Sequence, residues 1–113
     1  MKKIKEFENL DISLSAMVNY YLSVPEYRFL DMLNNFANSQ GCGDEYHDCE
    51  FYENGLENEY IKYYDWSGNS ELTTVLNKTD FVKYLKIVTQ SFIETNDNDK
   101  DEILKLISLI ESN

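Results

Sequence analysis

Hydrophobic residues recur every three to four positions near both ends of the chain, a spacing that predicts amphipathic helices. The first expected helix covers residues 13–22. The second follows residues 23–26, whose S-x-x-E spacing is typical of a capping box. It should stop before Gly41, because glycine favours the left-handed position that ends a helix. The inward positions expected in these two helices are Leu14, Met17, Val18, Tyr21, Phe29, Leu30, Leu33, Phe36 and Ala37.

The middle of the chain changes to a two-residue period, which predicts β-strands. Residues 46–52 and 60–66 each place hydrophobic or aromatic side chains at alternate positions. Residues 71–76, rich in β-branched side chains, predict a third strand. The turn signals between them are Asn54-Gly55 and residues 67–69. Because both turns are short, we expect a three-stranded antiparallel meander.

Helical spacing returns after the strands. Thr79 is a suitable N-cap, with Asp80 near the positive end of the helix dipole, and residues 99–102 are suited to start a last helix. Their expected inward positions are Phe81, Tyr84, Leu85, Val88, Phe92, Ile103, Leu106, Ile107 and Ile110. Two helices, three strands and two further helices predict an α+β fold, because helices and strands are segregated along the chain.

The composition fits one domain over residues 1–113, since a chain of this length with 42% hydrophobic residues can bury a core. The formal net charge is −11, with 21 acidic and 10 basic residues. That balance argues against nucleic acid or anionic lipid as a direct ligand, because Lys and Arg hold those ligands. It favours a basic protein partner. No apolar run approaches the length of a membrane helix, and we expect a cytoplasmic protein.

Residues 44–71 concentrate acidic and aromatic side chains. Lys62 is the only lysine or arginine among nine carboxylates, and seven aromatic residues are interleaved with them. A concentration of negative charge attracts a basic protein surface, and Tyr and Trp anchor protein interfaces. We therefore expect a surface that binds a cationic protein such as a nuclease. The candidate binding residues are Asp48, Glu50, Tyr52, Glu53, Glu57, Glu59, Tyr60, Tyr64, Asp65 and Trp66.

Other chemistry is less well supported. His47 with Cys42, Asp48 and Cys49 has the residue types of a zinc site, but a core histidine beside two buried thiols explains them better. Catalysis by Cys49 and His47 would need an orienting third group. Carboxylate pairs are so abundant that a glycosidase dyad has no specificity as a signal. We expect no cofactor or metal, and two free cysteines in a reducing compartment.

An ordered set of sequence segments gives a further indication of function. They are the apolar helix with Phe29, Leu30, Leu33 and Phe36, the tripeptide Gly41-Cys42-Gly43, the strand start Cys49-Glu50-Phe51, the aromatic strand from Tyr60 to Tyr64, the strand-to-helix passage Leu76-Asn77-Lys78-Thr79-Asp80-Phe81, and a last Ile/Leu helix. From Phe29 onward the chain resembles the ribonuclease-toxin immunity proteins of bacterial contact-dependent growth inhibition systems. The resemblance implies a small cytosolic protein without catalytic activity that binds the nuclease domain of a toxin.

The first hypothesis is therefore an immunity protein that neutralises a nuclease toxin, with a ribonuclease expected, by covering its basic substrate-binding surface. We expect it to act as a monomer. The second hypothesis is an acidic nucleic-acid mimic that inhibits another nucleic-acid-binding protein. The third is a small enzyme built on a carboxylate pair.

Overall fold

The structure is a computed structural model that describes residues 1–53 and 59–113, and at Glu53 and Glu59 the backbone only. The predicted turn at Asn54-Gly55 lies outside the described residues. The helices are α1 (Ser15–Ser23), α2 (Phe29–Ala37), α3 (Lys78–Ile93) and α4 (Lys100–Ser112), with 3-10 turns at Lys5–Phe7, Ile12–Leu14, Glu26–Arg28 and Asp97–Asp99. The strands are β1 (Cys42–Gly43), β2 (His47–Glu53), β3 (Glu59–Asp65) and β4 (Leu72–Asn77).

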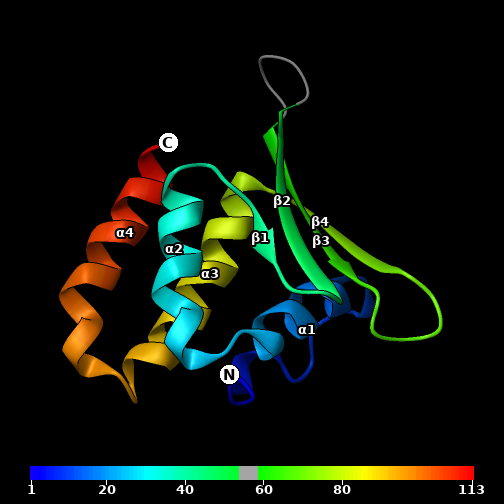
Figure 1. Ribbon diagram of the computed structural model, residues 1–113, viewed down its shortest axis with the longest axis horizontal. Helices are drawn as coiled ribbons and strands as arrows, with labels where there is room; N and C mark the ends of the chain where they lie inside the picture. The colour runs from blue at the N-terminus through cyan, green and yellow to red at the C-terminus, as the bar shows by residue number, and fades with distance from the viewer. Residues whose placement is uncertain (54–58) are drawn as a thin grey trace.

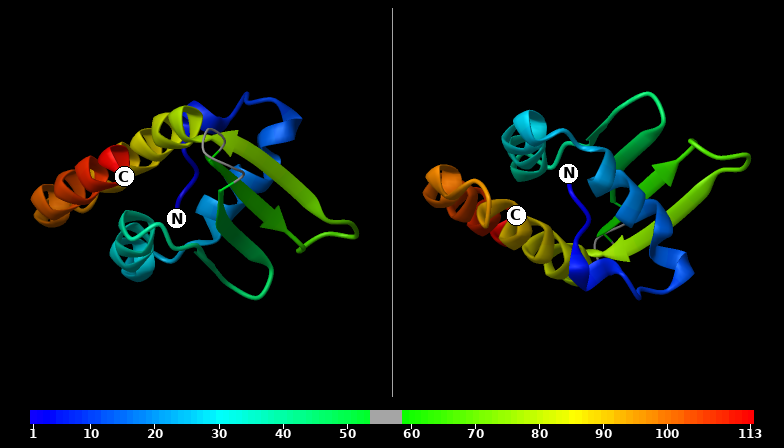
Figure 2. Two further views of the ribbon diagram at one scale, coloured as in Figure 1. Left: turned by 90° about the horizontal axis from the view of Figure 1, so that it is seen from above. Right: turned by 90° about the horizontal axis from the view of Figure 1, so that it is seen from below.

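The four strands form one antiparallel sheet in the order β1-β2-β3-β4, and the helices lie on one side of it (Figures 1 and 2). The α+β class is confirmed, but the prediction of three strands was wrong. Sequence patterning missed β1 because a two-residue strand has no period to detect. Gly41 allows β1 to approach β2, since a Cβ at this position would lie 2.9 Å from the Glu50 Cα atom.

The α2 helix stops before Gly41, as predicted, but the capping at its start and the left-handed residue after it differ from the prediction. No side chain caps the turn at Glu26–Arg28 or α2, and the Ser23 hydroxyl donates instead to the Tyr20 carbonyl at 2.6 Å. The capping-box prediction was therefore wrong, because Ser23 still belongs to α1. The left-handed residue after α2 is Ser39, with a φ of 56°, rather than Gly41. Gly41 is required for strand proximity instead.

The later helices start slightly differently from the prediction. The N-cap of α3 is Asn77, whose side chain accepts a hydrogen bond from the Asp80 amide at 2.8 Å, so the assignment to Thr79 was two residues late. Asp99 holds the N-cap position of α4 as expected, but its side chain makes no capping hydrogen bond.

The core fills the space between the sheet and the helices. Phe36 of α2 lies with its ring 5.3 Å from Phe51 of β2 and 5.5 Å from Phe81 of α3. The hydroxyl groups of Tyr21 and Tyr63 are 2.6 Å apart and join α1 to β3. The α4 helix packs on α2 and α3, in the layer farthest from the strands (Figure 1). One face of the sheet is therefore covered, and none of the helices in residues 1–53 and 59–113 covers the opposite face.

Candidate functional site

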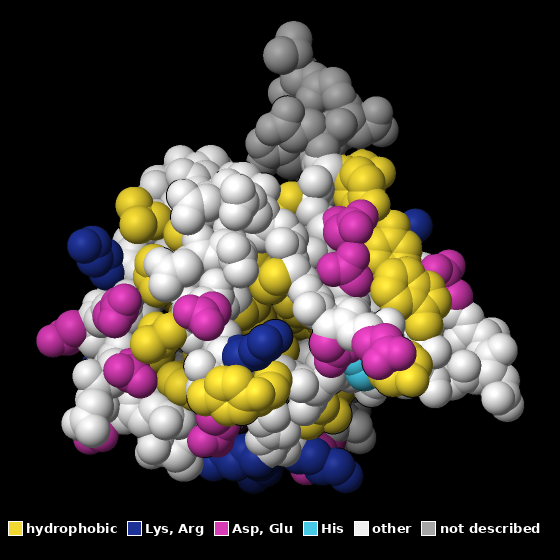
Figure 3. All heavy atoms as spheres, in the orientation of Figure 1, with side chains coloured by type: hydrophobic (Ala, Val, Ile, Leu, Met, Phe, Trp, Pro, Cys, Tyr) yellow, Lys and Arg dark blue, Asp and Glu magenta, His cyan; other side chains and the backbone are white. Residues whose placement is uncertain are grey.

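The uncovered face of the sheet, called here the outer face, is defined by the strand register. Asp48 pairs with Tyr64, Glu50 with Lys62, and Tyr52 with Tyr60 across β2 and β3. Partners in an antiparallel pair point to the same side of the sheet. The described side chains of the outer face are Asp48, Glu50, Tyr52, Tyr60, Lys62, Tyr64, Thr73 and Val75. Figure 3 shows acidic side chains beside a column of hydrophobic and aromatic ones over the strands.

Aromatic rings stack in two places on this face. The rings of Tyr52 and Tyr60 are 5.0 Å apart with an interplanar angle of 13°, and those of Tyr64 and Trp66 are 5.2 Å apart at 17°. The hydroxyl groups of Tyr52 and Tyr64 are 3.0 Å apart and connect the two stacks. Rings fixed by their neighbours lose little further conformational entropy on binding, which suits them as anchors.

Two carboxylates lie beside the stacks. Burial and the neighbouring Glu50 carboxylate raise the pKa of Asp48. The Tyr52 hydroxyl donates to the Glu50 carboxylate, and this bond lowers the pKa of Glu50, with Asp48 and Lys62 contributing in the same direction. Glu50 thus disfavours the ionised form of Asp48, and a cation arriving from a partner would favour it.

Lys62 is the one base of the outer face among the described side chains. Its Nζ atom lies 4.9 Å from the centre of the Tyr64 ring, and it is the register partner of Glu50. A cation already rests on an aromatic ring here, which shows that the face offers cation–π contacts as well as carboxylates. The arrangement is suited to hold Lys and Arg side chains of a partner.

The predicted binding residues divide into three groups. Asp48, Glu50, Tyr52, Tyr60 and Tyr64 lie together on the outer face, and Trp66, 42% exposed, extends it beyond the end of β3. Asp65 does not join them, because it is only 2% exposed and lies on the covered face. The reason is the two-residue period of β3, which turns Asp65 away from its neighbours. Glu53 and Glu59 pair through their backbones, and Glu57 lies outside the described residues.

Asp65 has a structural role instead. Its carboxylate accepts hydrogen bonds from the Asn19 side chain at 2.7 Å and from the Ser67 amide at 2.9 Å and hydroxyl at 2.6 Å. Burial acts to raise the pKa of Asp65, but the bonds from Ser67 and Asn19 and the nearby His47 outweigh it, so the pKa is lowered. The carboxylate therefore ties α1 to the end of β3.

We expect Asp65→Asn to destabilise the protein by about 1.5–3 kcal/mol at pH 7, the range for hydrogen bonds to charged groups. The folded pKa lies below the unfolded value of about 3.9, so the ionised group stabilises the fold above that pH. This contribution is lost as the pH falls through the folded value. Urea unfolding of both proteins at pH 7, 5 and 3 should show the difference shrinking at the lowest pH. A difference that does not change with pH would contradict this role.

The alternatives based on His47 and the cysteines are not supported. His47 lies between two carboxylates, with Nδ1 3.2 Å from Asp44 and Nε2 3.5 Å from Asp65, rather than in the core beside the thiols. Burial raises the pKa of the Cys49 thiol well above its usual range, so it is a poor nucleophile. Within the described residues, no group of three or more His, Cys, Asp or Glu residues is arranged to hold a metal ion. Both cysteines are free thiols.

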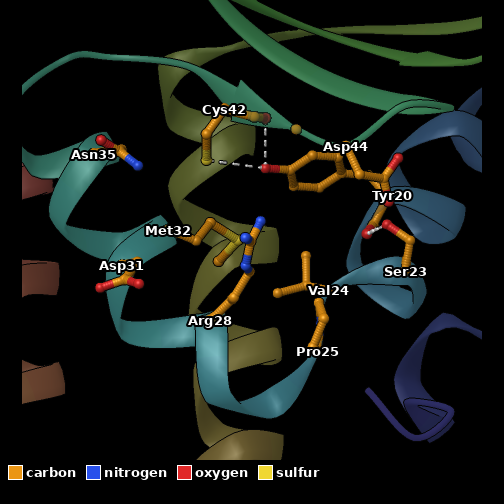
Figure 4. Close-up of a pocket in the computed structure, with 11 residues that line it drawn as sticks. Tyr20, Ser23, Val24, Pro25, Arg28, Asp31, Met32, Asn35, Cys42 and Asp44 are labelled. Atoms are coloured by element: carbon orange, nitrogen blue, oxygen red, sulfur yellow. Dashed lines mark hydrogen bonds between the residues drawn. The ribbon is translucent and has the colours of Figure 1, made fainter.

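Away from the outer face, a cavity of about 290 Å³ lies between β1 and the connection from α1 to α2 (Figure 4). The Tyr20 hydroxyl at its wall donates to the Cys42 carbonyl at 2.9 Å, and the Arg28 side chain reaches into it beside Met32. The lining carries both signs of charge, because it includes Arg28 as well as Asp31 and Asp44. The cavity therefore offers mixed charge without the stacked aromatic rings of the outer face.

Sequence reasoning missed the contribution of β4 to the outer face. Val75 is 58% exposed and lies beside Lys62, and Thr73 lies beside Tyr64. Their β-branched side chains predicted a strand but carried no signal for which side of the sheet would be uncovered.

Comparisons with known proteins bear on the family. A family model described as CDI immunity protein matches residues 13–107, which extends the resemblance from α2 back to α1. Searches of curated proteins and of solved structures returned no match. Among the helices of residues 1–53 and 59–113, none is long and apolar enough to cross a membrane. The match spans most of the chain and agrees with its ordered segments, and the chain belongs to the CDI immunity protein family, the immunity proteins of contact-dependent growth inhibition.

Proposed function

We propose that this immunity protein neutralises a nuclease toxin, with a ribonuclease the favoured class, by laying the outer face over the toxin's basic substrate-binding surface. The observation that carries the proposal is the Asp48–Glu50 carboxylate pair beside two aromatic stacks, on a sheet face that none of the described helices covers. Nucleases hold RNA phosphates with Lys and Arg, and the outer face offers such side chains carboxylates in place of phosphates.

The inhibition needs no chemistry by the immunity protein. Asp48 and Glu50 would pair with the toxin's cations, while Tyr60, Tyr64 and Trp66 would supply most of the contact area. The rigid stacks keep the entropy cost of binding low. We propose that the protein acts in the cytoplasm as a monomer, without a cofactor, and has no hydrolytic activity of its own.

The experiment is co-expression with the cognate toxin domain, which we expect a neighbouring gene to encode and which is called here the toxin domain. The chain should restore growth and abolish the nuclease activity of the purified toxin domain at equimolar ratio. If the chain restores growth but the toxin domain cleaves no nucleic acid, the nuclease part of the proposal fails. A chain that binds other nucleic-acid-binding proteins and leaves the toxin domain active would instead favour the nucleic-acid mimic.

We also expect the association rate with the toxin domain to depend steeply on salt. The net charge of −11 and the acidic outer face attract a basic partner over a distance that salt shortens. The rate should fall at least about tenfold between about 0.01 M and 1 M salt, where the screening length drops from about 30 to 3 Å. Stopped-flow mixing measures it. A rate that is independent of salt would rule out electrostatic steering.

A further inference from the structure

The β4 strand forms one edge of the sheet and, within the described part of the chain, pairs with β3 alone. The register shows which of its backbone groups are used. The Trp66 amide donates to the Tyr46 carbonyl at 2.8 Å, so even-numbered residues of β3 bond to β2 and odd-numbered ones to β4. Because Tyr63 pairs with Thr74, the even-numbered residues of β4 bond to β3. Thr73 and Val75 therefore direct their amide and carbonyl groups away from the sheet.

This edge lacks the features that natural proteins use to prevent strand addition. Such edges are protected by charged side chains, proline or bulges. Residues 72–77 read Leu-Thr-Thr-Val-Leu-Asn and contain no charged residue, no proline and no glycine, in a chain that is 27% charged. Thr74 fixes the strand from the covered face, accepting from the Met17 amide and donating to the Ser13 carbonyl at 2.8 Å. The edge is therefore both held in place and unprotected.

We propose that the free edge of β4 accepts an extended, basic strand of the toxin domain, which continues the sheet by one strand. This inference rests on the proposed function. Alternate side chains of the added strand would project onto the outer face beside Thr73 and Val75, and so extend the surface that carries Asp48 and Glu50. A second copy of this chain fits poorly, because each copy carries a net charge of −11 and Glu71 adjoins the edge.

The test is Val75→Pro, which removes an amide donor that folding does not use. Proline is tolerated on edge strands where its nitrogen faces solvent. We expect cooperative unfolding close to that of the wild type, and affinity for the toxin domain reduced at least about tenfold. Val75→Thr is the matched control, because it keeps both the amide and the β-branched shape, and it should bind nearly as the wild type. A Val75→Pro variant that folds and binds with unchanged affinity would overturn strand addition.

Amide hydrogen exchange supplies a second measurement that does not depend on a variant. In the wild-type complex with the toxin domain, the Thr73 and Val75 amides should become protected, whereas those of Thr74 and Leu76 are protected with or without the partner. Continued fast exchange at Thr73 and Val75 in a complex that inhibits the toxin would overturn this inference and leave the proposed function standing. Protection that instead appears in the free chain as its concentration rises would assign the edge to a second copy and overturn it too.

Discussion

Replacing Asp48 by Asn together with Glu50 by Gln is expected to weaken binding of the toxin domain by about 2–5 kcal/mol, the range for removing one side of a buried interfacial charge pair. Both substitutions keep the shape of the side chain and remove the charge. The partner's cations would then be buried without a carboxylate. Isothermal titration calorimetry at physiological salt measures the loss.

The matched control is Asp101→Asn with Glu102→Gln, which removes the same charge from exposed positions in the first turn of α4. Charges far from an interface mainly alter the association rate, so this pair should lose only a few-fold in affinity. Equal losses from the two pairs would mean that net charge alone governs binding. A larger loss from the α4 pair would place the interface on the helices and contradict the outer face as the binding site.

Phe36→Ala is expected to destabilise the protein by about 3–5 kcal/mol, the usual cost of truncating a buried phenylalanine. Phe36 is 1% exposed and is the ring of α2 that meets both β2 and α3. Removing it leaves a cavity beneath the sheet. Urea unfolding followed by circular dichroism measures the change.

Tyr27→Ala serves as the control for this truncation, because Tyr27 is 81% exposed. It should change stability by no more than about 0.5 kcal/mol. At low urea, folded Phe36→Ala protein should still bind the toxin domain, since Phe36 does not reach the outer face. If Phe36→Ala lowered the free energy of unfolding by less than about 1 kcal/mol, the sheet would not depend on this ring cluster for support.

Long, strongly periodic segments were predictable from the sequence. In α4 all four predicted inward residues, Ile103, Leu106, Ile107 and Ile110, are buried, and the strands lie within a residue or two of their expected positions. Element ends were less predictable. Thr79 and Asn77 are both acceptable N-caps, and only the fold shows which side chain reaches a free amide. The β1 strand exists through pairing with β2 rather than through its own two residues.

Sequence periodicity by itself determined that Asp48, Glu50 and Tyr52 share one side of β2, and that Tyr60 and Tyr64 share one side of β3. The reason is local, because a strand turns alternate side chains to opposite faces. Tertiary structure alone decided that these two sides coincide and stay uncovered, since that depends on register and on where the helices pack. It also decided that Asp65 is buried and that β4 ends the sheet. Burial and edges are properties of long-range neighbours, which no local pattern contains.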